Sequence, residues 1–250
     1  MSLRVGILSD IHGNVWALEA VLEHAKNHGV DQLVNLGDTL YGPLKPRATY
    51  DRLLHENIAI TIQGNQDRTI FEAGALDLAR SSTLAYVIRD LGEEPIHWMA
   101  QLPKSAILES DVFLCHGAPR GDTIYLLEDV LDGYAAVRSD AAIKELLTSV
   151  HQPVVVCGHS HVPRVVMLAH GQLVVNPGSV GLPAFDDVQP VRHFMETFAP
   201  HAAYAILEKS TRGWDVSLQR VAYNHGAAAE LARSLGRDDW AQGIATGRMM

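Results

Sequence analysis

Short apolar runs and amphipathic segments alternate along the first part of the chain. Residues 4–8 form an apolar run typical of a buried strand. Apolar residues then recur with near-helical spacing in a segment that Asn14 can cap and that Gly29 can end. Because residues 32–36 form a second apolar run, this stretch predicts a parallel β-α-β unit with a right-handed crossover.

The alternation of strand-like and helix-like segments continues along the rest of the chain. The further strands expected are 58–62, 105–109, 112–116 and 153–157, and two hairpins are expected within 164–176 and 202–221. The further helices expected are 46–56, most of 66–100, 126–149 and 226–235, the last followed by a polar tail. We find no internal repeat, low-complexity segment or linker in the pattern. The sequence therefore predicts an α/β protein with one domain over residues 1–250, a core of about 4–223, and a C-terminal helix and tail over 224–250.

Composition limits the location and the partners. Hydrophobic residues make up 47% of the 250 residues and charged residues 20%, which is typical of a globular protein. The net charge of −9, with no block of Lys or Arg, disfavours an extended nucleic acid, although a small anionic substrate could bind at a local cation. No segment approaches the ~18 apolar residues of a membrane span, and the first residues lack the apolar core of a signal peptide. We expect a cytoplasmic protein without membrane contact, in which Cys115 and Cys157 are reduced thiols.

Five of the predicted strands end directly before polar residues that can bind a metal. These residues are Asp10 and His12, Asp38, Asn65, His116, and His159 with His161, one group for each strand. Any one of these motifs alone is more often a polar turn or a surface histidine. Open α/β sheets, however, place their ligands at the carboxyl ends of strands, so five such groups in succession predict one metal centre.

The number and type of these side chains indicate the kind of centre. Seven candidate donors are too many for one tetrahedral zinc ion, whereas they fit two divalent ions that share one carboxylate. A mixture of imidazole and carboxylate ligands suits Mn, Fe, Zn, Co or Ni, and the sequence does not choose among them. Two such cations would give an acidic protein the local positive charge that a phosphate ester needs.

This set of motifs resembles that of the calcineurin-like metallophosphoesterases. The strings Ser-Asp-Ile-His-Gly-Asn at 9–14 and Asn-Pro-Gly-Ser-Val-Gly at 176–181 are similar to those of the small bacterial and archaeal phosphodiesterase-like branch. The resemblance runs from residue 4 to about 210. It implies a four-layer α/β/β/α sandwich of two mixed sheets flanked by helices, with a dinuclear metal site at one edge.

The resemblance also implies a role for each candidate. Asp10, His12 and His161 would hold the first ion, Asn65, His116 and His159 the second, and Asp38 would bridge the two. The expected reaction is hydrolysis of a small phosphate ester, preferably a diester, by a metal-bridging hydroxide that attacks phosphorus in line, with Asp38, Asn65 and His116 as the catalytic set. A nucleotide or protein phosphomonoesterase is the alternative. A non-catalytic scaffold of the same fold is disfavoured because all seven candidates are intact.

The chain departs from the family pattern in three places. Gln66 follows Asn65 where many relatives have a histidine, and an amide can donate a hydrogen bond but cannot deliver a proton. The arginine that protein phosphatases and diadenosine tetraphosphatases carry soon after the bridging aspartate is missing. Residues 186–200 resemble an insertion, expected as an exposed loop, a lid or a contact in a homo-oligomer, in which Arg192 and His193 could supply a polar group. Asp67 is expected to support the site or to cap a helix.

Overall fold

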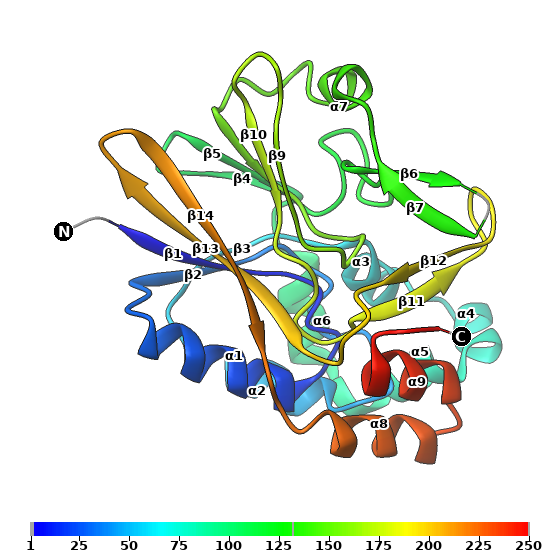
Figure 1. Cartoon of the computed structure of the whole chain (residues 1–250). Helices are drawn as coiled ribbons and strands as arrows, with labels where there is room; N and C mark the ends of the chain where they lie inside the picture. The colour runs from blue at the N-terminus through cyan, green and yellow to red at the C-terminus, as the bar shows by residue number, and fades with distance from the viewer. Residues whose placement is uncertain (1–2, 132, 250) are drawn as a thin grey trace.

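Two five-stranded mixed sheets form the centre of the protein, and helices cover their outer faces (Figure 1). The computed structural model describes residues 3–131 and 133–249. The first sheet has the order β14 (Gly213–Val221), β13 (Ala202–Ser210), β1 (Arg4–Leu8), β2 (Gln32–Asn35) and β3 (Ile58–Thr61). The second has the order β4 (Ser105–Leu108), β5 (Val112–Cys115), β8 (Val154–Val156), β10 (Leu173–Asn176) and β9 (Arg164–Met167). The mixed α/β fold predicted from the sequence is confirmed.

The helices and two small hairpins complete the chain. The helices are α1 (Val15–Asn27), α2 (Pro46–Leu53), α3 (Asn65–Phe71), α4 (Ala75–Arg80), α5 (Ser82–Leu91), α6 (Glu93–Ala100), α7 (Asp140–Leu146), α8 (His225–Ser234) and α9 (Asp238–Thr246). The hairpins are β6 (Glu128–Leu131) with β7 (Tyr134–Val137), and β11 (Ala184–Asp187) with β12 (His193–Glu196). Residues 3–131 and 133–249 contain no helix with the length and apolar character needed to cross a bilayer.

The β-α-β unit predicted at the start of the chain is present. β1 and β2 pair in parallel, and α1 connects them. The side chain of Asn14 accepts a hydrogen bond from the backbone N–H of Ala17 at 3.2 Å, which satisfies one of the free donors at the start of α1. The buried face of α1, including Leu18 and Val21, packs on the first sheet around Tyr204.

Parallel pairing directs several strands to the same edge. β3 is parallel to β2 in the first sheet, and β5, β8 and β10 are parallel to one another in the second. The core between the sheets contains alternate residues from both, such as Ile7 and Val34 from one and Leu114 and Val156 from the other. This packing brings the carboxyl ends of the parallel strands of both sheets together.

The expectation of one helix over 126–149 is wrong. Residues 128–131 and 134–137 pair as the antiparallel hairpin β6–β7, and only residues 140–146 are helical. Gly133 has a φ of +85°, a left-handed conformation that suits a turn and not a helix. The apolar residues Leu126 and Leu127 are buried against Ile143 of α7, so tertiary packing accounts for the apolar pattern that resembled a longer helix.

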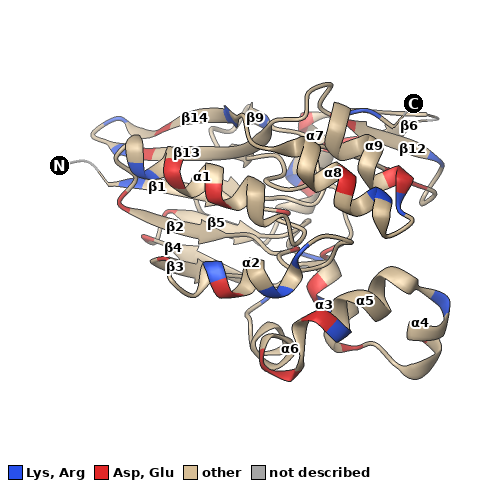
Figure 2. Cartoon of the chain, turned by 90° about the horizontal axis from the view of Figure 1, so that it is seen from below, with Lys and Arg blue, Asp and Glu red and all other residues tan. Residues whose placement is uncertain are grey.

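The C-terminal residues and residues 186–200 also differ from expectation. The segment expected as a polar tail contains α9, whose Trp240 and Ile244 are buried against α8. Residues 186–200 are not an exposed loop throughout, because they contain most of the β11–β12 hairpin, and His193 and Met195 of β12 are buried. Seen from below, the described Lys and Arg residues are scattered among Asp and Glu over the helices (Figure 2).

Candidate metal centre

The seven side chains predicted from the sequence lie at the edge where the two sheets meet. Asp10, His12, Asp38 and Asn65 follow strands of the first sheet, and His116, His159 and His161 follow strands of the second. Six of them form two groups in which the candidate ligand atoms lie within 4.8 Å of one another: Asp10 with His12 and His161, and Asp38 with His116 and His159. Asn65 adjoins the second group, because its Oδ1 lies 3.0 Å from His116 Nε2. Each group combines residues of both sheets.

The first group presents three lone pairs to one point. His12 Nε2 lies 3.1 Å from His161 Nε2, which lies 3.3 Å from Asp10 Oδ1. The opposite nitrogen of each ring, Nδ1, bonds to a backbone carbonyl: that of Tyr41 at 2.9 Å and that of Leu182 at 2.6 Å. A carbonyl can only accept, so Nδ1 carries the proton and Nε2 is left with its lone pair. Lone pairs this close to one another fit a bound cation.

Asp10 gives an independent reason to expect a cation. Its Oδ2 accepts hydrogen bonds from Ser9 Oγ at 2.6 Å and from the backbone N–H of His159 at 3.1 Å. Its Oδ1 is buried and has no hydrogen-bond partner. An unpaired buried acceptor costs about 1–3 kcal/mol, and more when it is charged, unless a cation satisfies it. The residues present therefore fit a metal at this position.

The second group is arranged in the same way. His116 Nε2 lies 3.4 Å from Asp38 Oδ2, and its Nδ1 bonds to the carbonyl of Leu36 at 2.9 Å. Asp38 Oδ1 accepts the backbone N–H of Gln66 at 2.7 Å, which fixes the carboxylate and leaves Oδ2 turned toward the histidine. His116 Nε2 is also 3.9 Å from Asp10 Oδ1, so the two groups are adjacent.

The backbone at these positions is strained. Eight non-glycine residues in the described part of the chain have a positive φ, and five of them are candidate ligands. These five are Asp10, His12, Asp38, His159 and His161, with φ between +52° and +66°. Non-glycine residues rarely adopt this conformation, and it persists where the surrounding structure and function require it.

Two glycines allow the loops to approach one another. A Cβ on Gly158 would lie 2.0 Å from Ser9 Oγ, and a Cβ on Gly64 would lie 2.2 Å from Asp38 Oδ1. Both distances are far below van der Waals contact, so only glycine fits at these two places. The Gly-Asn and Gly-His pairs of the sequence thus have a packing reason beside the candidate ligands.

Burial and the neighbouring charges set the ionisation of the histidines. Burial and the adjacent His161 lower the pKa of His12 to about 4, and burial and His116 lower the pKa of His159 to about 4. Burial also opposes the charged form of His116, but the carboxylates of Asp38 and Asp10 outweigh it and raise its pKa to about 10. The two carboxylates therefore attract positive charge into the site, and a bound cation would supply it.

Asp67 supports the centre as expected. Its carboxylate accepts the backbone N–H groups of Asp38 and Thr39, both at 2.9 Å, and that of Gly64 at 3.0 Å. Burial and the charge of Asp38 raise the pKa of Asp67 to about 7. Asp67 thus joins the loops after β2 and β3, and its bond to the backbone N–H of Gly64 caps the start of α3.

The sequence did not reveal how His159 is oriented. The ring of Tyr125 stacks on the His159 imidazole, with 4.7 Å between centroids and 21° between planes. The Tyr125 hydroxyl bonds to Nε2 of the buried His193 at 3.1 Å. Arg192 and His193, which were expected to supply a polar group, are not among the described residues that line the cavity over the centre. Local sequence spacing does not indicate the contact between Tyr125 and His159, because the two residues lie far apart in the sequence.

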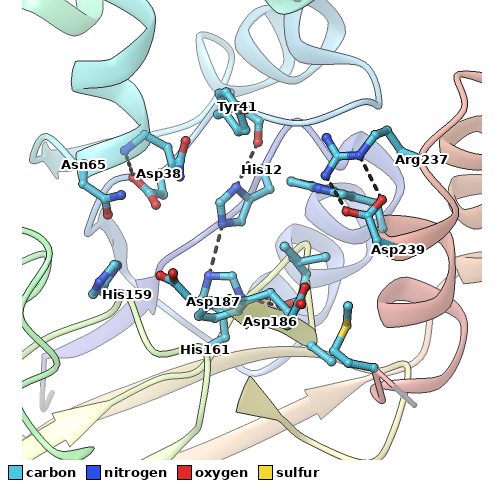
Figure 3. Close-up of a pocket in the computed structure, with 16 residues that line it drawn as sticks. His12, Asp38, Tyr41, Asn65, His159, His161, Asp186, Asp187, Arg237 and Asp239 are labelled. Carbon is cyan, nitrogen blue, oxygen red and sulfur yellow. Dashed lines mark hydrogen bonds and ion pairs between the residues drawn. The ribbon is translucent and has the colours of Figure 1, made fainter. Parts of the chain in front are cut away.

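A cavity of about 260 Å³ opens over both groups (Figure 3). Besides five of the candidate ligands, namely His12, Asp38, Asn65, His159 and His161, its described lining includes Tyr41, Gln66, Leu182, Ala184, Phe185, Asp186, Asp187, Arg237, Asp239, Trp240 and Met249. The last four come from the C-terminal segment, which the sequence analysis did not connect with the site.

Two mixed sheets bring imidazoles, carboxylates and an amide together at one edge, under an open cavity, an arrangement that suits a metal-dependent enzyme. Residues 3–197 match the calcineurin-like phosphoesterase superfamily domain, and the chain belongs to this superfamily. This assignment indicates metal-dependent hydrolysis of phosphate esters.

Comparison with individual proteins agrees with this assignment. The crystal structure of a metallophosphoesterase from Sphaerobacter thermophilus has a TM-score of 0.75 and 25% identity, covering 99% of this chain and 100% of that chain. Protein PH1004 from Pyrococcus horikoshii OT3 shares the fold, with a TM-score of 0.75, 18% identity and the same coverage. Protein MJ0912 of Methanocaldococcus jannaschii is 25% identical over 201 residues, which are 72% of this chain and 76% of that protein. The family expected from the sequence motifs is confirmed.

Proposed function

We propose that the protein hydrolyses phosphate esters, and phosphodiesters in preference to monoesters, with two divalent metal ions. The observation that carries this proposal is the pair of adjacent ligand groups, in which His116 Nε2 lies 3.9 Å from Asp10 Oδ1 of the other group. Each group has enough donors for an open coordination site. The buried, unpartnered Oδ1 of Asp10 supports a cation between them.

The family resemblance implies a set of ligands for each ion, and the two observed groups support this assignment. Asp10, His12 and His161 would hold one ion, Asn65, His116 and His159 would hold the other, and Asp38 would be shared between them. When bound, two such ions supply Lewis acidity toward the phosphoryl oxygens and lower the pKa of water. Mn, Fe, Zn, Ni and Co all suit these ligands, and Mn is the first ion to test.

The buried free thiols of Cys115 and Cys157 are compatible with the cytoplasm as the location.

The chain's own residues prepare the site for this chemistry. The carbonyl bonds to Nδ1 of His12, His116 and His161 hold these rings with Nε2 directed toward the centre. Gln66 lines the cavity, and its side-chain amide can donate a hydrogen bond to an oxygen of the substrate but cannot protonate a leaving alcohol. The site is therefore best suited to esters with a stable leaving group, such as a phenolate.

A substrate panel tests the proposal. The purified protein, loaded separately with Mn, Ni, Zn and Fe, should hydrolyse bis-p-nitrophenyl phosphate faster than p-nitrophenyl phosphate, cyclic nucleotides or dinucleoside polyphosphates. Asp38→Asn should lower turnover by about a thousandfold or more with an unchanged circular dichroism spectrum. Asp215→Asn, an isosteric change on the exposed side of β14, is the matched control. Undiminished turnover in Asp38→Asn would contradict the bridging role.

A further inference from the structure

Residues beyond the matched family domain form part of the cavity wall. The superfamily match ends at residue 197, whereas α9 covers 238–246. The ring of Trp240 on α9 meets the His12 ring edge to face, with 5.5 Å between centroids and 83° between planes. Phe185 of β11 meets His161 similarly, with 4.5 Å between centroids. Two aromatic side chains thus lie directly beside two candidate metal ligands.

Arg237 is the single Lys or Arg among the described residues that line the cavity, and its charge is already engaged. Its Nε donates to Asp239 Oδ1 at 2.9 Å and its Nη2 donates to Asp239 Oδ2 at 2.5 Å (Figure 3). Its Nη1 donates to Thr83 Oγ1, and the guanidinium carbon lies 5.6 Å from the centre of the Trp240 ring. Such a two-point pair leaves little positive charge for a substrate.

The rest of the charged lining is acidic. Asp186 and Asp187 lie on β11 at the same cavity (Figure 3). Asp187 Oδ1 accepts the backbone N–H groups of Val188 and Gln189, and Asp186 lies 3.7 Å from the exposed Arg192. Apart from the candidate metal ligands, the described lining therefore holds three carboxylates and one guanidinium. A substrate with a further phosphate would meet repulsion here and find no free cation.

We infer that this wall selects phosphodiesters whose alcohol groups are uncharged and excludes esters that carry a further phosphate. The inference rests on the proposed function and names its substrate class. The phosphodiester binds at the metal centre, an apolar or aromatic alcohol group packs on Trp240 and Phe185, and Asp239 keeps Arg237 from binding a second anion. α9 is thus a specificity element contributed by residues beyond the superfamily match.

Two substrates that differ only in one phosphate test this inference. The p-nitrophenyl ester of thymidine 5′-phosphate and its 3′-phosphorylated counterpart share the leaving group and the nucleoside. The Mn-loaded protein should show a kcat/KM about tenfold or more lower for the 3′-phosphorylated ester. The quantity compared between variants is the ratio of kcat/KM for the unphosphorylated ester to kcat/KM for the 3′-phosphorylated ester. Asp239→Asn frees Arg237 and should reduce this ratio by about tenfold, with an unchanged metal content.

The neighbouring residue provides a matched control. Asp238→Asn makes the same change of charge on the same turn of α9, but Asp238 does not line the cavity and its side chain is 85% exposed. Its ratio should equal that of the wild type. Should Asp239→Asn fail to fold, Asp186→Lys adds a cation to the same cavity and should also reduce the ratio, with Asp238→Lys as its control.

The outcomes separate this inference from the proposed function. Equal kcat/KM for the two esters in the wild type, or equal effects of the Asp239 and Asp238 variants, would overturn the inference and leave the proposed function intact. Hydrolysis of neither ester nor of bis-p-nitrophenyl phosphate by the metal-loaded protein would overturn the proposed function, and the inference with it.

Discussion

The strained backbone of the candidate ligands leads to a prediction about stability. His159 has a φ of +66° and stacks on Tyr125, so both its backbone and its side chain are constrained. His159→Gly and His159→Ala remove the same imidazole and the same stacking contact, and they differ from each other by one methyl group. The difference in unfolding free energy between these two variants therefore reports on the backbone alone.

The expected magnitude follows from two opposing effects. The left-handed conformation costs a non-glycine residue about 1–2 kcal/mol. Glycine, in turn, loses more backbone entropy on folding than alanine, which favours alanine by about 0.4–1 kcal/mol. The glycine variant should therefore be more stable than the alanine variant by about 0.5–1 kcal/mol, the reverse of the usual order.

A helical position provides the matched comparison. Glu19 is exposed in the middle of α1, where alanine should be more stable than glycine by about 1 kcal/mol. The measurement is urea unfolding followed by circular dichroism, with EDTA present so that metal binding does not contribute, and with a check that the m-values agree. An alanine variant at His159 that equals or exceeds the glycine variant in stability would refute the reasoning.

Three further predictions concern the metal centre. Adding Mn to EDTA-treated protein at about 1,000 times its Kd should raise the free energy of unfolding by about 4 kcal/mol for each ion bound, measured by urea unfolding, and no increase would argue against a metal site. Tyr125→Phe keeps the ring on His159 and should bind two ions per chain, whereas Tyr125→Ala should bind about one ion fewer. The metal content is measured by atomic emission, and equal contents in the two variants would argue against the orienting role of the ring. Gln66→His should raise turnover of alkyl phosphodiesters by about 10²-fold and that of p-nitrophenyl esters much less. Equal gains on both would contradict the explanation that the wild type lacks an acid to protonate poor leaving groups.

The sequence was sufficient to find the candidate ligands because their positions follow from strand topology. Each follows a short apolar run, and parallel strands end at a common edge, so residues as distant as Asp10 and His161 come within 3.3 Å of each other. The helix after Asn14 and the hairpins within 164–176 and 202–221 were equally accessible, since capping and turn residues act locally. The roles of the seven residues as ligands remain a proposal.

The parts that the sequence analysis missed depend on distant contacts or on a weak local signal. An Asp-Gly pair precedes the strand at 134–137 and is a known hairpin signal, but the apolar spacing over 126–149 favours a helix. α9 has only two turns, and its burial depends on α8 and on Leu44, far away in the chain. The pairing of Arg237 with Asp239 and the stacking of Tyr125 on His159 are likewise visible only in three dimensions.

The division of the ligand groups between the sheets has a consequence for how the protein matures. Each group combines residues from both halves of the sandwich, so a half-folded chain would bring neither set of candidate ligands together. If these residues are the ligands, tight binding of either ion would require the two halves to be docked. In a recombinant preparation, the molar ratio of metal to polypeptide would consequently serve as a titre of correctly assembled molecules.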